Sequence, residues 1–325
     1  MTGFAAQAQA VFRRARGRRI LVVGDLMIDE WIWGTVTRIS PEAPVPVVSV
    51  NDHSFTLGGA GNVANNLRAL NAHVAFAGTV GDDEYGRRVR DLLKGEDVDD
   101  AGVFALADRL TTRKTRVVAH NQQVVRADWE TVVPLNGAKR KEFAAFVRQR
   151  AAKSDAVILS DYAKGLLSRE VVEAALEAPL VLADPKPQNL DIFAGVTCVA
   201  PNTHEAEIGS GIKIVDDKSL EAAGVRLLRR LKCRYVVITR GEHGMALFGR
   251  NGERLAVPSV AHTVYDVSGA GDTVIATLAL AMATGATVKS ALTLANFAAG
   301  AVVEKLGTAT ASPREILALV RRGRT

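Results

Sequence analysis

Short apolar runs recur along the chain, and each lies beside a stretch of 10 to 15 residues that suits a helix. Residues 20–23, 156–159, 180–183 and 235–238 have the length and composition of buried strands. Strands that alternate with helices in this way predict βαβ units and a parallel sheet. We therefore expect an α/β domain with a doubly wound, mostly parallel sheet flanked by helices. Ligands of such sheets bind beyond the carboxyl ends of the strands.

Two segments interrupt this alternation. Residues 31–50 contain three prolines, which exclude a helix. Residues 111–133 alternate polar and apolar side chains around Asn121 and Gln122, a pattern that predicts a β-hairpin. Together the two segments predict a small β-sheet that stands off the body as a lid or a dimer face. We expect the lid and the body to form one domain over residues 1–325.

The cysteines and the lengths of the apolar stretches indicate in which compartment the protein works. Cys198 and Cys233 have no metal-ligand spacing and are interpreted as buried thiols of a protein from a reducing compartment. The first ten residues lack the apolar run of a signal peptide. The longest apolar stretch, residues 274–283, is too short to span a bilayer. We therefore expect a cytoplasmic enzyme that has no membrane partner.

The formal net charge is +6, with arginines gathered near both ends of the chain. Nucleic-acid binding is one interpretation of such ends. No aromatic residues are interleaved with these arginines for base stacking, so solvated helix termini are the favoured interpretation. A mildly positive protein also attracts small anionic substrates.

A glycine-rich turn carries the strongest chemical signal. Gly269, Ala270, Gly271 and Asp272 precede residues 273–283, which are rich in Ala and Leu and suit a helix. Backbone amides at such a helix start bind anions such as phosphate. A carboxylate at Asp272 would lie where it can accept a proton from a hydroxyl that attacks the phosphate. Taken alone, the motif also suits an ordinary helix N-terminus.

Companion motifs strengthen the interpretation as a kinase. They lie in residues 57–62, 184–186, 202–205, 239–244 and 266–273. Five motifs in this order resemble the ribokinase-like (PfkB) carbohydrate kinase family. The resemblance implies a doubly wound α/β domain with a β-sheet lid, in agreement with the fold expected above. It also implies an ATP-dependent transfer of phosphate to a sugar hydroxyl.

The resemblance assigns roles to residues of this chain. It implies that Asp272 is the base, and that Gly269, Ala270 and Gly271 form the anion hole for the γ-phosphate. It implies that Asn202 and Glu205 organise Mg²⁺ and the phosphates; a surface carboxylate is the other interpretation of Glu205. Implied contacts to the sugar come from Asp29, Gly58, Gly59 and Asn62, with Lys186 near the reacting groups. Implied contacts to the nucleotide come from Asn202, Thr239, Gly241, Gly244, Asn296 and Gly300.

The predicted hairpin carries further candidate contacts to the substrate. Lys114 and Arg116 share one strand face, as do Arg126 and Asp128, because side chains alternate along a strand. Three cations on one face would suit the phosphate of a sugar phosphate. An exposed hairpin face with cross-strand ion pairs is the other interpretation.

A narrower resemblance concerns the substrate. Residues 24–29, 38–47, 121–123, 160–165 and 306–310, together with Arg126 and Asp128, resemble the branch of this family that phosphorylates heptose 7-phosphate. That branch implies phosphorylation of the C1 hydroxyl of D-glycero-β-D-manno-heptose 7-phosphate to the 1,7-bisphosphate, for ADP-heptose and lipopolysaccharide core synthesis. It also implies a homodimer formed through the lid. In many relatives the kinase is fused to a nucleotidyltransferase. The present chain ends at Thr325, soon after residues 306–310, so we expect a separate protein to supply the nucleotidyltransferase step. A kinase of another sugar and a catalytically silent regulator stay open as alternatives.

Overall fold

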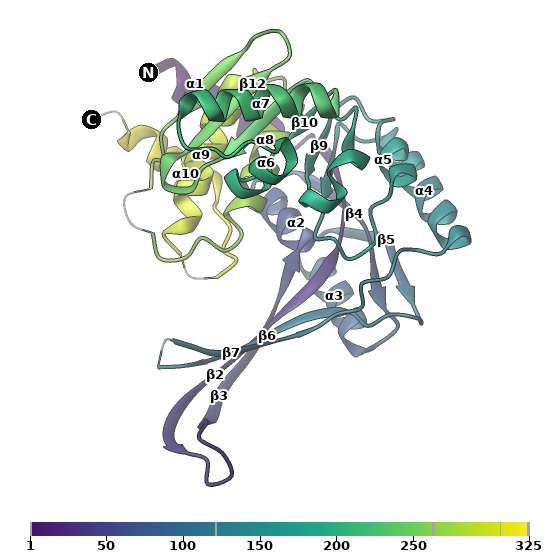
Figure 1. Ribbon diagram of the computed structural model, residues 1–325, viewed down its shortest axis with the longest axis vertical. Coiled ribbons are helices and arrows are strands. Elements are labelled where there is room, and N and C mark those ends of the chain that lie inside the picture. Colours follow the sequence, from purple (N-terminus) through teal and green to yellow (C-terminus); the bar gives the residue numbers. More distant parts are fainter. Residues whose placement is uncertain (1, 121, 262–263, 306, 324–325) are drawn as a thin grey trace.

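The computed structural model describes residues 2–120, 122–261, 264–305 and 307–323. It contains a helix-covered body built on a nine-stranded sheet and a separate four-stranded sheet that projects from the body (Figure 1). Asn121 and Leu306, which belong to two of the motifs above, lie outside the described residues.

The sheet of the body has the strand order β13-β12-β11-β10-β9-β8-β1-β4-β5. Its strands are β1 (Arg19–Gly24), β4 (His73–Gly81), β5 (Asp99–Leu106), β8 (Ala156–Ser160), β9 (Val181–Asp184), β10 (Cys198–Val199), β11 (Tyr235–Thr239), β12 (Met245–Gly249) and β13 (Arg254–Val257). Only β12 and β13 pair antiparallel with their neighbours; all other pairs within this sheet are parallel. The predicted mostly parallel sheet is thus confirmed.

Helices cover both faces of this sheet. One face carries α1 (Thr2–Ala15), α2 (Ala60–Ala69), α3 (Glu84–Gly95), α8 (Ala270–Ala283), α9 (Val288–Val303) and α10 (Pro313–Arg322). The other carries α4 (Gly137–Ala151), α5 (Arg169–Ala175), α6 (Thr203–Ser210) and α7 (Asp217–Leu231). Two short 3₁₀ helices, η1 (Pro187–Phe193) and η2 (Gly241–His243), complete the body. In the described part of the chain, no helix is both long and apolar enough to cross a membrane.

Strand β1 shows why an unbroken apolar run is needed at the centre of the sheet. Ile20 and Val22 belong to the hydrophobic core on one face, and Leu21 and Val23 to the core on the other. Successive side chains of a strand point to opposite faces, so a strand covered on both sides has no polar position. The four apolar runs of the sequence form β1, β8, β9 and β11.

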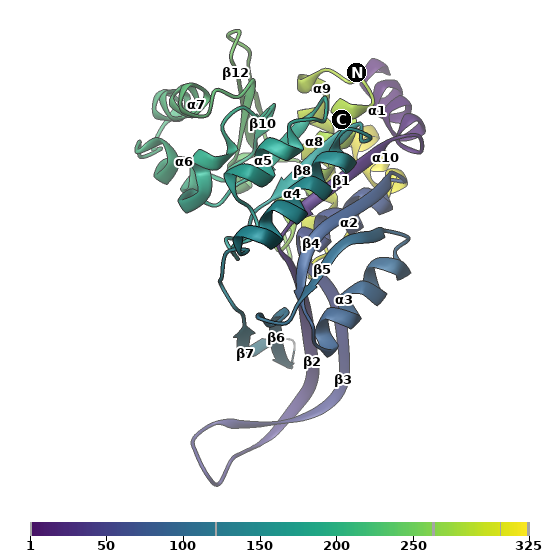
Figure 2. The same cartoon turned by 90° about the vertical axis from the view of Figure 1, so that its right-hand side faces the viewer.

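The separate sheet, here called the lid, has the strand order β3-β2-β6-β7. Its strands are β2 (Leu26–Ile39), β3 (Pro46–Gly59), β6 (Thr112–Ala119) and β7 (Gln122–Trp129). Strand β2 begins, and strand β3 ends, deeper in the body than residues 31–50 predict, because Met27, Ile28 and Leu57 are buried there. Figure 2 shows the β2–β3 hairpin reaching beyond the other two strands. The lid therefore joins directly to the carboxyl end of β1.

Candidate functional site

The predicted base lies at the start of α8. Gly269 caps this helix in the left-handed conformation, with φ of 77°. A Cβ atom there would lie 2.5 Å from Nδ2 of Asn62, so both the backbone angle and the space require glycine. No described side chain caps the start of α8, and the first backbone amides of a helix lack acceptors within the helix, so this turn is able to bind an anion. Asp272 lies in this turn and is only 5% exposed.

The Asp272 carboxylate is held at both oxygens. Asn62 of α2 donates from Nδ2 to Oδ2 at 2.8 Å, and the Tyr162 hydroxyl donates to Oδ1 at 2.8 Å. Burial raises the pKa of Asp272 to about 6, against the lowering effect of these two hydrogen bonds. A carboxylate with this pKa is ionised at neutral pH and basic enough to accept a proton during a reaction.

Tyr162 has no role in the interpretation of the sequence, although residues 160–165 contribute to the resemblance. Its loop follows β8 and is fixed by the buried carboxylate of Asp25, whose Oδ2 accepts from the amides of Tyr162 at 2.9 Å and Lys164 at 3.2 Å. Asp161 accepts from the amide of Ala163 at 2.8 Å. Ala163 has a φ of 56°, a conformation that costs a non-glycine residue about 1–3 kcal/mol. The signal in the sequence that could have identified Tyr162 as a site residue is its position two residues after β8, at the carboxyl end of a buried strand.

The Asn202–Glu205 motif forms a capping box at the start of α6. The Glu205 amide donates to Oδ1 of Asn202, and the Asn202 amide donates to Oε2 of Glu205, both at 2.9 Å. The side chain of Asn202 therefore serves the helix and is not among the residues that line the cavity described below. Oε1 of Glu205 forms an ion pair with Nζ of Lys186 at 2.6 Å.

The charges near Glu205 suit a cation. Burial, together with repulsion by Glu205 and Asp272, raises the pKa of Asp184 well above its usual value, while Lys186 acts in the opposite direction. Among the described residues, no group of three or more His, Cys, Asp and Glu side chains has a metal-binding arrangement. Magnesium commonly keeps several waters and binds one or two carboxylates plus phosphate oxygens, so Glu205 is an adequate protein ligand.

The predicted sugar contacts lie where the lid joins the body. Asp29 is 4% exposed, and its Oδ1 pairs with Nη1 of Arg116 at 2.6 Å. A Cβ atom on Gly58 would lie 2.5 Å from Oδ2 of Asp29, so only glycine permits this close approach. Asn62 is fully buried and contacts Asp272 as described, and Gly59 precedes α2.

The four hairpin residues are brought to one face of the lid. Lys114 lies between Asp29 and Asp128 in the strand register, and Arg116 lies opposite Arg126. Arg126 forms its ion pair with Asp128 at 2.9 Å, with both side chains partly exposed to solvent. The two arginines differ in burial: the Arg116 side chain is 16% exposed and that of Arg126 is 48% exposed.

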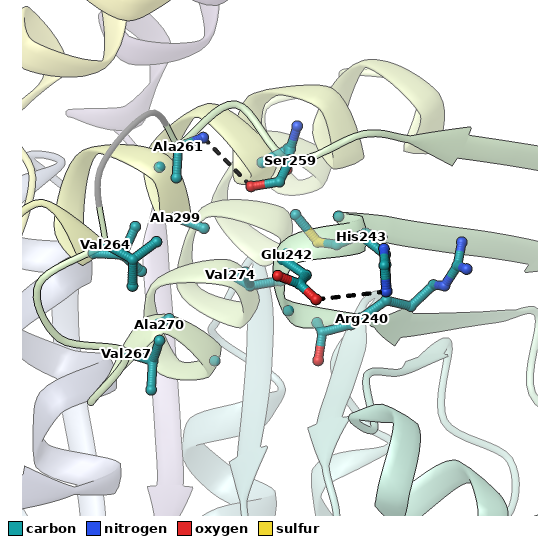
Figure 3. Close-up of a pocket in the computed structure, with 18 residues that line it drawn as sticks. Arg240, Glu242, His243, Ser259, Ala261, Val264, Val267, Ala270, Val274 and Ala299 are labelled. Atoms are coloured by element: carbon teal, nitrogen blue, oxygen red, sulfur yellow. Dashed lines mark hydrogen bonds and ion pairs between the residues drawn. The ribbon is translucent and has the colours of Figure 1, made fainter. Parts of the chain in front are cut away.

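A cavity of about 600 Å³ lies beside the start of α8, between η2 and α9 (Figure 3). Five of the six residues predicted to bind the nucleotide line it: Thr239, Gly241, Gly244, Asn296 and Gly300. Apolar side chains such as Val264, Val267 and Val274 face the same space, and Ala270 and Gly271 bring the start of α8 to its edge. Gly300 also lies against Val260, whose Cγ2 would be 2.7 Å from an added Cβ.

Comparisons with known proteins agree with this geometry. The model of the pfkB family carbohydrate kinases matches residues 18–315. Bifunctional protein HldE of Geobacter metallireducens is 45% identical over 314 residues, which cover 95% of this chain and 64% of that protein. Bifunctional protein HldE of Geobacter sulfurreducens is 43% identical over the same share of both chains. This chain therefore spans a little under two thirds of the length of these relatives.

Solved structures share the fold. The structure of Arabidopsis thaliana ribokinase complexed with ribose and ATP has a TM-score of 0.73 at 18% identity, covering 94% of this chain and 99% of that one. Escherichia coli phosphofructokinase-2 in complex with potassium has a TM-score of 0.79 at 18% identity, with the same coverage. The fold expected from the sequence, a ribokinase-like α/β domain, is confirmed.

Proposed function

The chain belongs to the pfkB family of carbohydrate kinases, and from that premise we propose that it transfers the γ-phosphate of ATP to the C1 hydroxyl of D-glycero-β-D-manno-heptose 7-phosphate. The observation that carries the proposal is the placement of Asp272. It is buried, its pKa is raised to about 6, its helix contributes Ala270 and Gly271 to the cavity, and it is near enough to Asp29 for that carboxylate to raise its pKa. The product would be the 1,7-bisphosphate.

The reaction needs a base, a phosphate site and positioning. Asp272 accepts the proton of the C1 hydroxyl as that oxygen attacks the γ-phosphorus, and ADP leaves. The amides that open α8 stabilise the charge on the transferred group. The cavity between η2 and α9 holds the adenine end of ATP, with its apolar side chains against the base.

Magnesium, held by Glu205 and phosphate oxygens, would neutralise charge on the phosphates. Asp184 is crowded by the carboxylates of Glu205 and Asp272, and a cation beside Glu205 would relieve that repulsion. Lys186, now paired with Glu205, is close enough to the site to lower the pKa of Asp272 and so lies near the reacting groups. Asn202 supports Glu205 through the capping box.

The choice of a heptose phosphate rests on two supports. The first is the set of motifs in residues 24–29, 38–47 and 160–165, together with 45% identity to a protein named bifunctional protein HldE. The second is the lid, where the positively charged Lys114, Arg116 and Arg126 share one face and none of them lines the cavity. A substrate that already carries a phosphate at its far end would use that charge.

An assay of ATP consumption across a panel of sugars and sugar phosphates tests the proposal. The expected result is the highest kcat/KM with D-glycero-β-D-manno-heptose 7-phosphate, and much lower values with unphosphorylated heptose and with hexose phosphates. A higher kcat/KM with another sugar phosphate would replace the substrate and leave the kinase chemistry in place. Absence of phosphorylation with the whole panel would refute the proposal.

The lid also supports the proposal of a homodimer. Its exposed apolar side chains include Ile39 at 61%, Val50 at 57% and Val125 at 53% exposure, and a second copy of the chain would cover them. Sedimentation should give the mass of two chains at working concentration, and a single-chain mass would rule the dimer out. That a separate protein carries the nucleotidyltransferase step stays a prediction.

A further inference from the structure

Tyr162 makes a contact that packing of the core does not require. Its hydroxyl donates to Oδ1 of Asp272 at 2.8 Å, across 110 residues of sequence. Its backbone is fixed by Asp25, and the loop contains the left-handed Ala163. A loop with this many constraints places one side chain accurately, and the side chain that it directs at the reacting carboxylate is Tyr162.

The two donors to Asp272 divide its oxygens between them. Asn62 occupies Oδ2, and Asn62 is in turn held by Asn66, whose Nδ2 donates to its carbonyl oxygen at 2.9 Å. Thr273 completes this side of the network by donating to Oδ1 of Asn66 at 2.8 Å. On the other side, the phenol is the donor to Oδ1. With Tyr162 removed, the carboxylate would keep one fixed oxygen and could rotate about it.

We propose that Tyr162 is a positioning residue for the base: its hydroxyl holds Oδ1 of Asp272 so that the carboxylate faces the hydroxyl of the bound sugar. The inference rests on the proposed function only in that Asp272 acts as the base; it does not depend on which sugar is bound. The phenol does not transfer a proton. Burial, with the nearby carboxylates of Asp272 and Asp184, raises the pKa of Tyr162 well above its usual value, so it stays a donor at neutral pH.

Other groups around Asp272 also act on its charge. Lys186, two residues after the end of β9, lowers the pKa of Asp272, while Asp29 of β2 raises it. Asp184, the last residue of β9, is repelled by Asp272. Nζ of Lys186 lies 5.6 Å from the centre of the Tyr162 ring. Removal of the phenol hydroxyl leaves all these charges in place. A change in the pKa of Asp272 would therefore report the lost hydrogen bond.

The first test is Tyr162→Phe, with Tyr235→Phe as the matched control. Tyr235 is a buried tyrosine of β11 that has no contact with Asp272 among the described residues. At pH values where Asp272 is fully ionised, Tyr162→Phe should lower kcat roughly tenfold or more, because the carboxylate would no longer be held in line with the sugar hydroxyl. The KM values for ATP and sugar should stay within about twofold, since neither binding site changes. Tyr235→Phe should match the parent in both.

The pH dependence of kcat distinguishes positioning of the base from a purely structural role of Tyr162. The parent should lose kcat as the pH falls through about 6, where Asp272 takes up a proton. Loss of a hydrogen bond to the charged form raises the pKa of the carboxyl, so the acidic limb of Tyr162→Phe should shift to higher pH. A fluorinated tyrosine at position 162 keeps the shape and donates more strongly, so it should shift the limb to lower pH. No shift with either substitution would overturn the proposal.

Two further measurements separate this inference from the proposed function. In the Asp272→Asn background, Tyr162→Phe should change the residual rate little, because the group that it positions is gone; an equal loss in both backgrounds would show an independent role and overturn the proposal. Titration of the Asp272 carboxyl carbon by NMR, assigned by comparison with Asp272→Asn, needs no substrate. It should show the same upward shift in Tyr162→Phe even if heptose 7-phosphate proves to be the wrong substrate. An unchanged titration would overturn the inference and leave the proposed function untouched.

Discussion

The two ends of the site are built in different ways. At the body end, Asp272 receives hydrogen bonds from α2 and from the loop after β8, and its partners are themselves held by buried groups. At the lid end, Arg126 and Asp128 are two residues apart on one strand and both are partly exposed. Buried, fully satisfied networks fix geometry, whereas exposed ion pairs contribute little to it. The body end therefore suits the chemical step, and the lid end suits recognition of the substrate.

The largest expected effect lies at the body end. Asp272→Asn keeps the shape of the side chain and removes the base, which typically costs about 10² to 10⁴ in rate. Steady-state kinetics should show this loss in kcat with little change in the KM for ATP. Asp191→Asn removes an exposed carboxylate that is paired with Arg230 and has no contact with Asp272 among the described residues; it is the control, with unchanged kcat. If Asp272→Asn retained turnover within a few-fold of the parent, Asp272 would not be the base.

Arg116 tests the junction between the two ends. Arg116→Ala leaves the buried carboxylate of Asp29 without its partner, and breaking such a pair costs about 3–5 kcal/mol of the free energy of unfolding. A charge-assisted contact to the substrate phosphate is worth about 1.5–3 kcal/mol, so the KM for the sugar phosphate should rise roughly 10- to 100-fold.

The comparison of two substrates decides what Arg116 does. Kinetics on the heptose phosphate and on the unphosphorylated heptose should show a loss confined to the phosphorylated substrate. Equal loss on both, together with a lower melting temperature, would mean that Arg116 only holds Asp29 and the lid in place. The KM for ATP should barely change in either case, because Arg116 does not line the nucleotide cavity.

The two ends also differ in how far the sequence alone could predict them. The glycine-rich turn predicts Asp272 at the start of α8 because the turn and the helix are local. Asn62 follows from a second local motif, at the start of α2. Tyr162 could not be predicted, since the fold alone brings its hydroxyl to Asp272. The alternation of side chains predicts a shared face for Lys114 and Arg116, but the ion pair between Arg116 and Asp29 depends on the register of two strands that are distant in sequence.

The fold, too, could be predicted from the sequence only in part. The apolar runs predict the central strands, because a strand covered on both faces must be apolar throughout. Strand β5 lies at the edge of the sheet and begins with Asp99 and Asp100, so it lacks that pattern. Strand β10 has only two residues, which is too short for any periodicity. The motif at Asn202 and Glu205 predicts a site, whereas the capping box that occupies Asn202 appears only in the three-dimensional arrangement.

Glu205 belongs to the body end but is expected to have a smaller effect than Asp272. Glu205→Gln keeps the capping interaction with the Asn202 amide through the amide oxygen and removes the negative charge. The variant should need a higher Mg²⁺ concentration for half-maximal activity, because the carboxylate helps to hold the hydrated ion. Titration of activity with Mg²⁺ at saturating ATP measures the change, and Glu207→Gln on the same helix is the control. Superimposable titrations of Glu205→Gln and the parent would assign Glu205 to the helix cap alone.

The smallest effect is expected at Arg126, and it sharpens the contrast within the lid. Arg126 lies opposite Arg116 in the strand register, but its side chain is 48% exposed and its carboxylate partner, Asp128, is partly exposed as well. Exposed ion pairs contribute about 0–1 kcal/mol, so Arg126→Ala should leave the melting temperature close to that of the parent. Solvent and salt screen the exposed charge of Arg126, so its loss should raise the KM for the sugar phosphate only a few-fold, well below the change in Arg116→Ala.

Repeating both assays at low and high ionic strength separates the two residues further, because salt should abolish the effect of Arg126→Ala and leave most of that of Arg116→Ala. If Arg126→Ala were instead as damaging as Arg116→Ala, the lid would close over the substrate and bury Arg126, and the exposed position described here would be that of the open lid.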